Sequence, residues 1–302
     1  MTSPFGPIVL IAESDVVDSL PRVERALGAL DLEHRVVVAE GPGDGARWAR
    51  ACLLSGERFL VAVGGEPLVH DVVNGMFENG RAIVASPLLG VVAAGTENEF
   101  SRQFGMPMDT ERECIHLAGD GVYPIDVGRV TCSDPGGTER SEYFVNIAEV
   151  GMGADMASRA EVLSRRVGRG RHFVAFWSAL LRAPRARVHV EAARQTYEGE
   201  AYQVVVGNGR FGVGGFRVSP RSFPGDGILE VLVHHGPKSH AFTSLPKSHR
   251  GEQVPSPNIA ELRGNRVRVK AEPRLRVAVD GRAIGWTPVS FEVLPRAVRL
   301  KV

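Results

Sequence analysis

The chain has 302 residues, of which 43% are hydrophobic and 24% charged, a composition typical of a globular protein with one large core or two modest ones. A formal net charge of +1 gives no general attraction to polyanions, so composition does not support nucleic-acid binding. The three cysteines lie far apart without a C-x-x-C pair, which does not indicate a disulfide framework or zinc knuckle and favours a reducing cytoplasm.

The first third of the chain alternates strand-like apolar runs with helical stretches. This alternation predicts βαβ crossovers and a parallel sheet. The apolar run near the amino terminus is the size of a strand, it lacks the basic start of a signal peptide, and no segment of the chain is long enough to span a bilayer. The predicted pairs of strand and helix are Ile8–Ala12 with Asp18–Leu30, His34–Val38 with Asp44–Leu54, and Phe59–Val63 with Val69–Phe77, and a further strand is predicted over Leu89–Ala93.

From about Ile125 the chain consists of short β-rich runs punctuated by glycine and proline, which predicts an antiparallel, sandwich-like second domain. One helical insertion is expected around Met156–Leu181, and a long surface connection over His234–Pro257. The predicted fold class is therefore α/β. A Rossmann-like parallel nucleotide-binding domain occupies residues 1–125, a β-rich domain occupies residues 126–302, and the last strand could return to the first domain.

A pair of glycines, Gly64 and Gly65, follows the predicted strand Phe59–Val63 and precedes a helix. Glycines at such a position let the backbone approach an anion, and the helix amino terminus supplies amide donors and a favourable dipole. An ordinary tight turn between strand and helix is the alternative for this motif taken alone.

Several motifs occur together in a characteristic order. The segment "VAVGGEPLVHDVVNGM" resembles the lipid-kinase signature GGDGT followed by E-V-x-N-G, and "PLLGVVAAGTENEFSRQFGMP" is similar to P-L-G-x-x-P-x-G-T-x-N-D-F-A-R-x-L-G-I-P. The later segments "IDVGRV", "FVNIAEVGMGADM", "VVVGNGRFGVGGFRVSPRSFPGDGILEV", "VAVDGR" and "FEVLPRAVRLKV" follow the same order to the carboxyl terminus. Over nearly its whole length the chain thus resembles the diacylglycerol kinase superfamily, which includes bacterial lipid kinases and sphingosine kinase-like catalytic domains.

The resemblance implies an enzyme that phosphorylates a lipid hydroxyl with ATP and magnesium, binding the nucleotide between its two domains. It places the nucleotide on Gly64, Gly65, Glu66, Pro67, Leu68, Thr96 and Asn98. The Thr96 and Asn98 turn keeps the family pattern. Glu66-Pro67-Leu68 replaces Asp-Gly-Thr, and because proline donates no N–H, one donor facing the phosphates is missing. The family's N-P-x-S-G loop is replaced by "AESDVV", and Ala39 replaces a threonine.

The same resemblance implies a structural magnesium on the Asp226 side chain with the carbonyls of Phe223 and Ile228, since a hard cation takes oxygen ligands. An Asp-Gly turn before a strand is the equal alternative.

The family's D-G-E motif, whose glutamate is taken as the proton acceptor, reads Asp280-Gly281-Arg282 here. A guanidinium stays protonated, so Arg282 cannot act as a base. Asp280 and Glu66 are the candidate catalytic carboxylates, and a plain hairpin turn is the alternative for "VDGR".

The stretch "SRRVGRGRHFVAFWSALLRAPRAR" suits either an anionic membrane surface or, as we favour, a helix that packs between elements and is flanked by solvated arginines. The expected partners are a nucleotide and a lipid substrate at the membrane surface, without nucleic acid and with a homodimer as an option. The expected location is cytoplasmic and peripheral to the membrane. A non-catalytic homologue that binds lipid or nucleotide is the main alternative, and an NAD kinase is disfavoured by the pattern of the second domain.

Overall fold

The computed structural model describes residues 4–94, 98–106, 110–134, 136–162, 170–212, 217–240 and 256–302. By their contacts the residues divide into two units, one of residues 1–127 with 295–302 and the other of residues 128–294. The boundary predicted after residue 125 lies close to Val127, and the last eight residues belong to the first unit.

The first unit is built on a parallel sheet. Its strands lie in the order β2 (His34–Ala39), β1 (Ile8–Glu13), β3 (Phe59–Val63), β6 (Leu88–Val92) and the end of β17 (Arg282–Lys301). All neighbouring pairs run parallel. Every residue of β3 and β6 is buried, as expected of strands covered on both faces.

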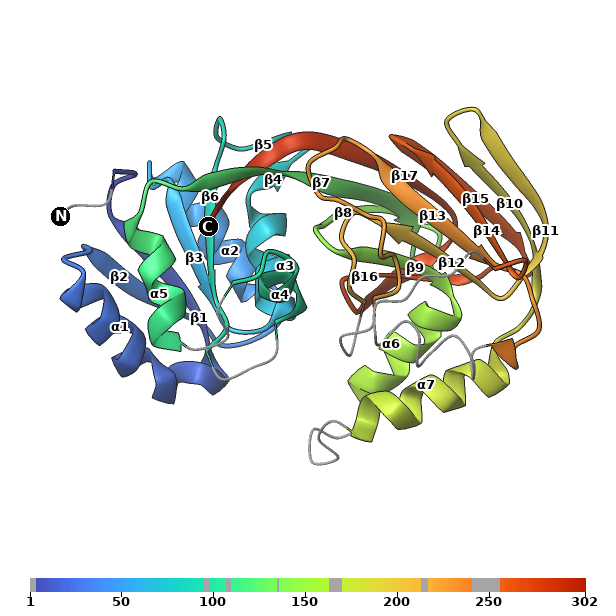
Figure 1. The fold of residues 1–302 in the computed structure, drawn as a ribbon, viewed down its shortest axis with the longest axis horizontal. Coiled ribbons are helices and arrows are strands. Elements are labelled where there is room, and N and C mark those ends of the chain that lie inside the picture. Colours follow the sequence, from blue (N-terminus) through green and yellow to red (C-terminus); the bar gives the residue numbers. More distant parts are fainter. Residues whose placement is uncertain are drawn as a thin grey trace. The chain divides into compact units, whose positions relative to one another are not determined.

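Helices cover both faces of this sheet (Figure 1). On one face α1 (Leu20–Ala29) and α5 (Thr110–Ala118) contact each other, and on the other face α2 (Asp44–Leu54) and α3 (Glu66–Gly75) do so. The short elements are the 3-10 helix η1 (Ser14–Ser19), α4 (Glu99–Gln103), and the strands β4 (Phe77–Glu78) and β5 (Arg81–Ala82). The predicted Rossmann-like α/β fold is confirmed.

Two predicted helices begin elsewhere in the structure. The helix predicted over Val69–Phe77 begins at Glu66, because Pro67 falls in its first turn, where a helix needs no N–H donor. The helix predicted from Asp18 begins at Leu20, after η1.

Lys301, near the end of β17, is fully buried in the first unit. Its Nζ donates to the carbonyl oxygens of His116 at 2.5 Å and Gly121 at 3.0 Å. The ammonium thereby satisfies a carbonyl group near the carboxyl end of α5, where a positive charge is favourable.

The second unit is a β-sandwich of two antiparallel layers. One layer runs β14 (Ile259–Gly264), β13 (Leu229–His234), β12 (Gln203–Gly207), β9 (Ile147–Gly151), β16 (Arg276–Val279) and β17. The other contains β11 (Gln195–Ala201), β10 (Ala186–Ala192), β15 (Arg266–Glu272), β17, β7 (Val122–Ser133) and β8 (Glu139–Phe144). β17 joins both layers, since Arg282–Trp286 pairs with β16 and Val289–Glu292 pairs with β15.

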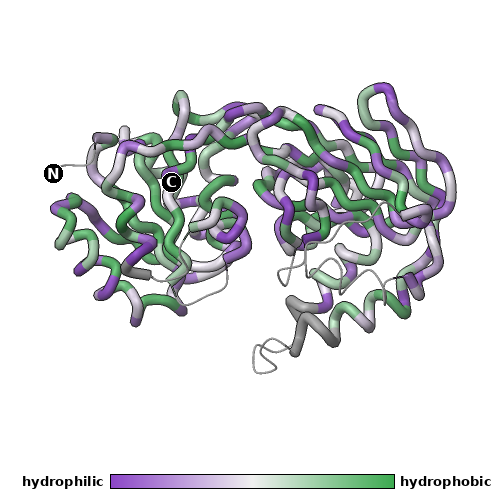
Figure 2. The backbone as a smooth tube through the Cα atoms, viewed as in Figure 1, coloured by the Kyte–Doolittle hydropathy of each residue, from purple (hydrophilic) through white to green (hydrophobic). Residues whose placement is uncertain are grey.

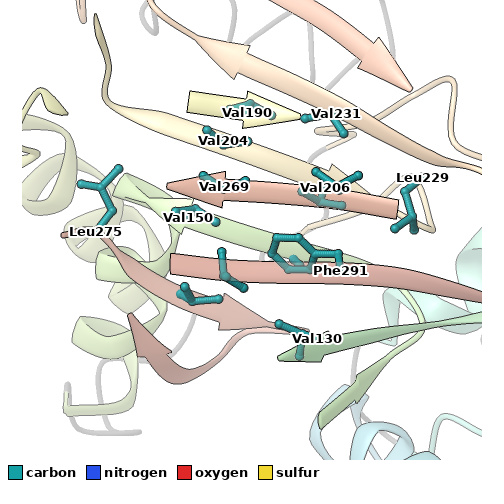
Figure 3. Packing of buried hydrophobic residues seen from close by; sticks show 14 of the residues in the cluster. Val130, Val150, Val190, Val204, Val206, Leu229, Val231, Val269, Leu275 and Phe291 are labelled. Atoms are coloured by element: carbon teal, nitrogen blue, oxygen red, sulfur yellow. The ribbon is translucent and has the colours of Figure 1, made fainter. Parts of the chain in front are cut away.

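Valine and leucine side chains from both layers meet in the core of the sandwich, with Phe291 among them (Figure 3). The rings of Phe144 and Phe291 pack edge to face with centroids 6.2 Å apart. On β15, Val267 and Val269 point inward while Arg266, Arg268 and Lys270 are exposed, the alternation of a sheet with one solvated face. Hydrophobic residues accordingly concentrate along the strands (Figure 2).

The predicted helical insertion consists of two helices, α6 (Met152–Val162) and α7 (Gly170–Arg182). They contact each other, and α6 also contacts β9 and β16. α7 buries Ala175, Ala179 and Leu180, so at these positions it acts as a packing helix. No helix within the described ranges has the length and apolarity to cross a membrane.

Candidate functional site

The Gly64–Gly65 turn lies at the carboxyl end of β3, between that strand and α3 (Figure 1). At this edge of a parallel sheet ligands commonly bind. Gly65 is the N-cap residue of α3 and has an extended backbone. A Cβ atom on Gly64 would come within 2.7 Å of Oε2 of Glu13, so a side chain at position 64 would require the Glu13 side chain to move.

The backbone amides of this turn are largely engaged within the protein. The Gly64 amide donates to the carbonyl of Val92 at 3.0 Å, and the Leu68 amide donates to the carbonyl of Gly65 at 3.2 Å. The Gly65 amide donates to Oε2 of Glu13 at 3.1 Å. Pro67 has no N–H. A phosphate at this turn would therefore have to displace an existing acceptor to reach the Gly65 amide.

Asn98 holds the turn from the side of β6. Its Nδ2 donates to the carbonyl of Gly64 at 3.2 Å, and its Oδ1 accepts the amide of Ser101 at 3.1 Å, which caps α4. Asn98 is fully buried, so its amide group is a fixed part of the turn. The predicted partner Thr96 lies outside the residues that the structure describes.

Leu68 faces α2, with its side chain only 2% exposed. A Cβ atom on Gly45 would lie 2.8 Å from its Cδ1, and one on Gly75 would lie 2.3 Å from the carbonyl oxygen of Ala46. The helices α2 and α3 thus pack closely, and Leu68 belongs to their interface. Leu68 was predicted to contact nucleotide, but the structure gives its side chain a packing role. Glu66, the first residue of α3, is half-buried and suits the positive end of the helix dipole.

The Asp280–Gly281 turn joins β16 to β17 in the second unit. Both residues have positive φ angles, +44° and +79°, which is the signature of a type I′ hairpin turn. The Asp280 carboxylate accepts three backbone amides, those of Val145 and Asn146 at 3.0 Å and of Ile147 at 3.1 Å. Both of its oxygens are used, so the carboxylate fixes the segment before β9. Arg282 begins β17 and pairs with Val279.

The same contacts explain why β8 and β9 are separate strands. The strand β8 ends at Phe144, and β9 begins at Ile147. The amides in between bond to Asp280 rather than to a neighbouring strand.

Asn208 brings a third motif segment to this place. Its Nδ2 donates to the carbonyl of Val145 at 2.8 Å, and its amide donates to the carbonyl of Asn146 at 3.0 Å. The segments "FVNIA", "VGNG" and "VDGR", far apart in the sequence, therefore meet in one hydrogen-bonded junction. Sequence reasoning did not single out Asn146 and Asn208. The signal in the sequence was an asparagine within each of two otherwise apolar segments.

Glu149 is a second residue that sequence reasoning missed. It lies on β9, only 6% exposed, and Oε1 accepts Nε2 of the buried Gln203 at 3.3 Å. Burial raises the pKa of this carboxyl to about 7. A charged residue inside the apolar segment "NIAEVG" was the signal in the sequence.

The predicted magnesium ligands lie in a turn that is held by its own hydrogen bonds. Oδ1 of the exposed Asp226 accepts the amide of Ile228 at 3.0 Å. The carbonyl of Phe223 accepts the amides of Gly225 at 2.8 Å and Asp226 at 3.4 Å. The described residues contain no cluster of three or more His, Cys, Asp or Glu side chains suited to a metal. Asp226 and the Phe223 carbonyl thus already accept backbone amides, and the magnesium site at this turn stays a prediction.

Comparisons with known proteins cover both units. Residues 12–130 match the diacylglycerol kinase catalytic domain, and residues 146–302 match the YegS C-terminal NAD kinase beta sandwich-like domain. The chain is 26% identical to a diacylglycerol kinase of Bacillus subtilis over 85% of this chain and 82% of that protein. It is 24% identical to the lipid kinase YegS of Escherichia coli K12 over 99% of this chain and 96% of that protein.

Among solved structures, a diacylglycerol kinase from Bacillus anthracis superposes with a TM-score of 0.73 at 20% identity, covering 99% of this chain and 97% of the other. An NAD kinase from Archaeoglobus fulgidus in complex with ATP superposes with a TM-score of 0.51 at 15% identity, covering 98% and 93%. These two likenesses concern the fold. Since both family domains match in order and the second alone spans half of the chain, this protein belongs to the diacylglycerol kinase superfamily.

Proposed function

We propose that this protein is a lipid kinase that transfers the γ-phosphoryl group of ATP to a lipid hydroxyl. The observation that carries the proposal is the match of both family domains, in order, together with a named lipid kinase aligned over 99% of the chain. A kinase that shares the fold has been crystallised with ATP, which supports ATP as the donor.

The nucleotide phosphates would bind at the amino end of α3, where Gly64 and Gly65 permit close approach and the helix dipole favours an anion. Asn98 would keep the turn in place through the Gly64 carbonyl. Thr96 stays a predicted contact. Magnesium also stays a prediction, as a companion of the triphosphate, and would neutralise its charge.

The acceptor hydroxyl needs a group that takes its proton. Asp280 is engaged by three backbone amides and Arg282 is cationic, which leaves Glu66 as the candidate. In the proposed step the lipid oxygen forms a bond to the γ-phosphorus and the bond from that phosphorus to the bridging oxygen of ADP breaks. The hydroxyl proton passes to the Glu66 carboxylate.

The lipid would be met at a membrane surface, with the protein peripheral to it in the cytoplasm, and a homodimer stays a prediction. Leu181 on α7 is 77% exposed and offers one apolar contact for such a surface. Co-sedimentation with vesicles of anionic phospholipid checks this part, and full recovery of the protein in the supernatant would contradict it.

The test of activity is the transfer of radiolabelled phosphate from ATP to diacylglycerol and to sphingosine-like lipids in mixed micelles with magnesium. We expect a labelled lipid product, and a loss of about 100-fold in kcat for Glu66→Gln. Glu24→Gln on the exposed face of α1 makes the same charge change away from the turn and should keep full activity. The absence of product with every lipid would refute the proposal.

A second candidate function is that of a homologue that binds nucleotide or lipid without turnover. Pro67 and the bond between Gly65 and Glu13 favour it, since both reduce the donors available to phosphates. Saturable ATP binding by calorimetry without lipid phosphorylation would establish this function instead.

A further inference from the structure

Glu13 is the last residue of β1 and lies beside the glycine turn. Ala12 pairs with Val63, so the next residue along β1 stands level with Gly64. Ile8, Leu10 and Ala12 face the core under α1 and α5, and the alternation of a strand therefore directs Glu13 to the other face, where α3 begins. The strand thus places the Glu13 carboxylate at the amino end of α3.

The Glu13 carboxylate occupies the space beside Gly64 that a side chain at position 64 would need. A Cβ atom on Gly64 would lie 2.7 Å from Oε2, 2.9 Å from Cδ and 3.0 Å from Cγ of Glu13. The same Oε2 accepts the Gly65 amide at 3.1 Å. A glycine pair before a helix admits an anion, and in this structure the anion is the protein's own side chain.

The backbone amides of Gly64, Gly65 and Leu68 already have acceptors within the protein. The Gly64 and Leu68 amides bond to protein carbonyls, and Pro67 contributes none. The Gly65 amide is a donor to a phosphate oxygen at the N-cap, and a carboxylate already in contact with it would repel that phosphate. The two anions are therefore alternatives at one site.

We propose that Glu13 lowers the polyphosphate affinity of the proposed nucleotide site, acting as an internal carboxylate that competes with phosphate for the Gly65 amide. The inference rests on the proposed function in that it assigns phosphates to this turn. Tight binding requires the Glu13 side chain to leave Gly65. The protein then binds polyphosphates more weakly than the geometry of the turn alone would allow.

The test measures affinity for ATP and for inorganic tripolyphosphate by calorimetry in the wild type, in Glu13→Gln and in Glu13→Ala. We expect at least about tenfold tighter binding in both variants, the effect of removing one opposed charge at close range. Glu24→Gln is the control with equal net charge and should bind as the wild type does. Equal affinity in wild type and Glu13 variants would overturn the proposal, and so would weaker binding in the variants.

A second measurement does not depend on the stability of the variants. The amide resonance of Gly65 in the 15N-labelled wild type should shift as Glu13 is protonated and shift again when tripolyphosphate is added. A Gly65 resonance that shifts neither on protonation of Glu13 nor on addition of tripolyphosphate would overturn the proposal. Lipid phosphorylation is assayed separately. Turnover with unchanged affinities overturns only the role of Glu13, whereas tighter polyphosphate binding in the variants without turnover by the wild type overturns only the kinase.

Discussion

The hairpin turn between β16 and β17 and the turn after β3 each pair a carboxylate with backbone amides, and the two pairings differ. At the hairpin between β16 and β17, the two carboxylate oxygens of Asp280 accept hydrogen bonds from three backbone amides of a neighbouring segment. At the turn after β3, Glu13 gives one oxygen to the single amide of Gly65, at the edge of the sheet where ligands bind. The first contact holds the segment before β9 in place, whereas the second is the contact that we propose an incoming phosphate replaces.

The largest effect is expected from Asp280→Ala. Removing a carboxylate that satisfies three backbone amides should lower the free energy of unfolding by about 3–5 kcal/mol, because the amides of Val145, Asn146 and Ile147 lose their acceptor. Urea unfolding of the full chain measures the loss. A loss under about 1 kcal/mol would show that the Asp280 carboxylate does not hold the segment before β9 in place.

The next effect concerns Glu149, a carboxyl on β9 beside the Asp280 junction. Burial raises its pKa from 4.5 to about 7, so the folded state binds the proton more tightly than the unfolded state. Stability contributed by this group is present below about pH 4.5 and is lost as the pH rises to about 7, for a total of roughly 3 kcal/mol. Glu149→Gln should abolish this dependence.

The variant Glu149→Gln can still accept the bond from Gln203. We therefore expect it to match the wild type near pH 4.5 and to exceed it at pH 8, as read from urea midpoints across the pH range. If the stability of both proteins changed with pH in the same way, the burial of a titrating carboxyl at this position would be excluded.

A smaller effect is expected from Pro67→Gly, which adds an N–H to the first turn of α3. One additional charge-assisted hydrogen bond should tighten tripolyphosphate binding by about tenfold. Pro21→Gly is the matched control, since Pro21 occupies the same early position of α1, outside the site. Equal affinity in both variants would show that the turn offers no further place for a phosphate.

The smallest effect is expected from Asp226→Asn. The carboxamide oxygen can still accept the Ile228 amide, and the residue is exposed, so stability should change by less than about 0.5 kcal/mol. Neither magnesium nor a chelator should shift the melting temperature. A drop in melting temperature on chelation that Asp226→Asn abolishes would reveal an ion at this turn.

The sequence predicted the elements of the fold better than the contacts of its carboxylates. Periodic apolar runs and paired glycines are local signals, and they predicted the parallel sheet and the turn after β3. The partners of Asp280 lie 133 to 135 residues away, and Gly65 lies 52 residues from Glu13. Such pairings depend on the register of non-neighbouring strands. The packing of the Leu68 side chain could not be predicted for the same reason, because its neighbour Gly45 lies on another helix.

The close packing of α2 on α3 has a kinetic consequence. With Gly45 against Leu68 and Gly75 against the backbone of Ala46, α3 packs closely on α2. We therefore expect the proposed exchange between Glu13 and an incoming phosphate to occur by rotation of one side chain over an unchanged backbone. Such rotations are completed in less than about a microsecond, so ligand association should follow a single exponential without a lag, at a rate that rises linearly with ligand concentration.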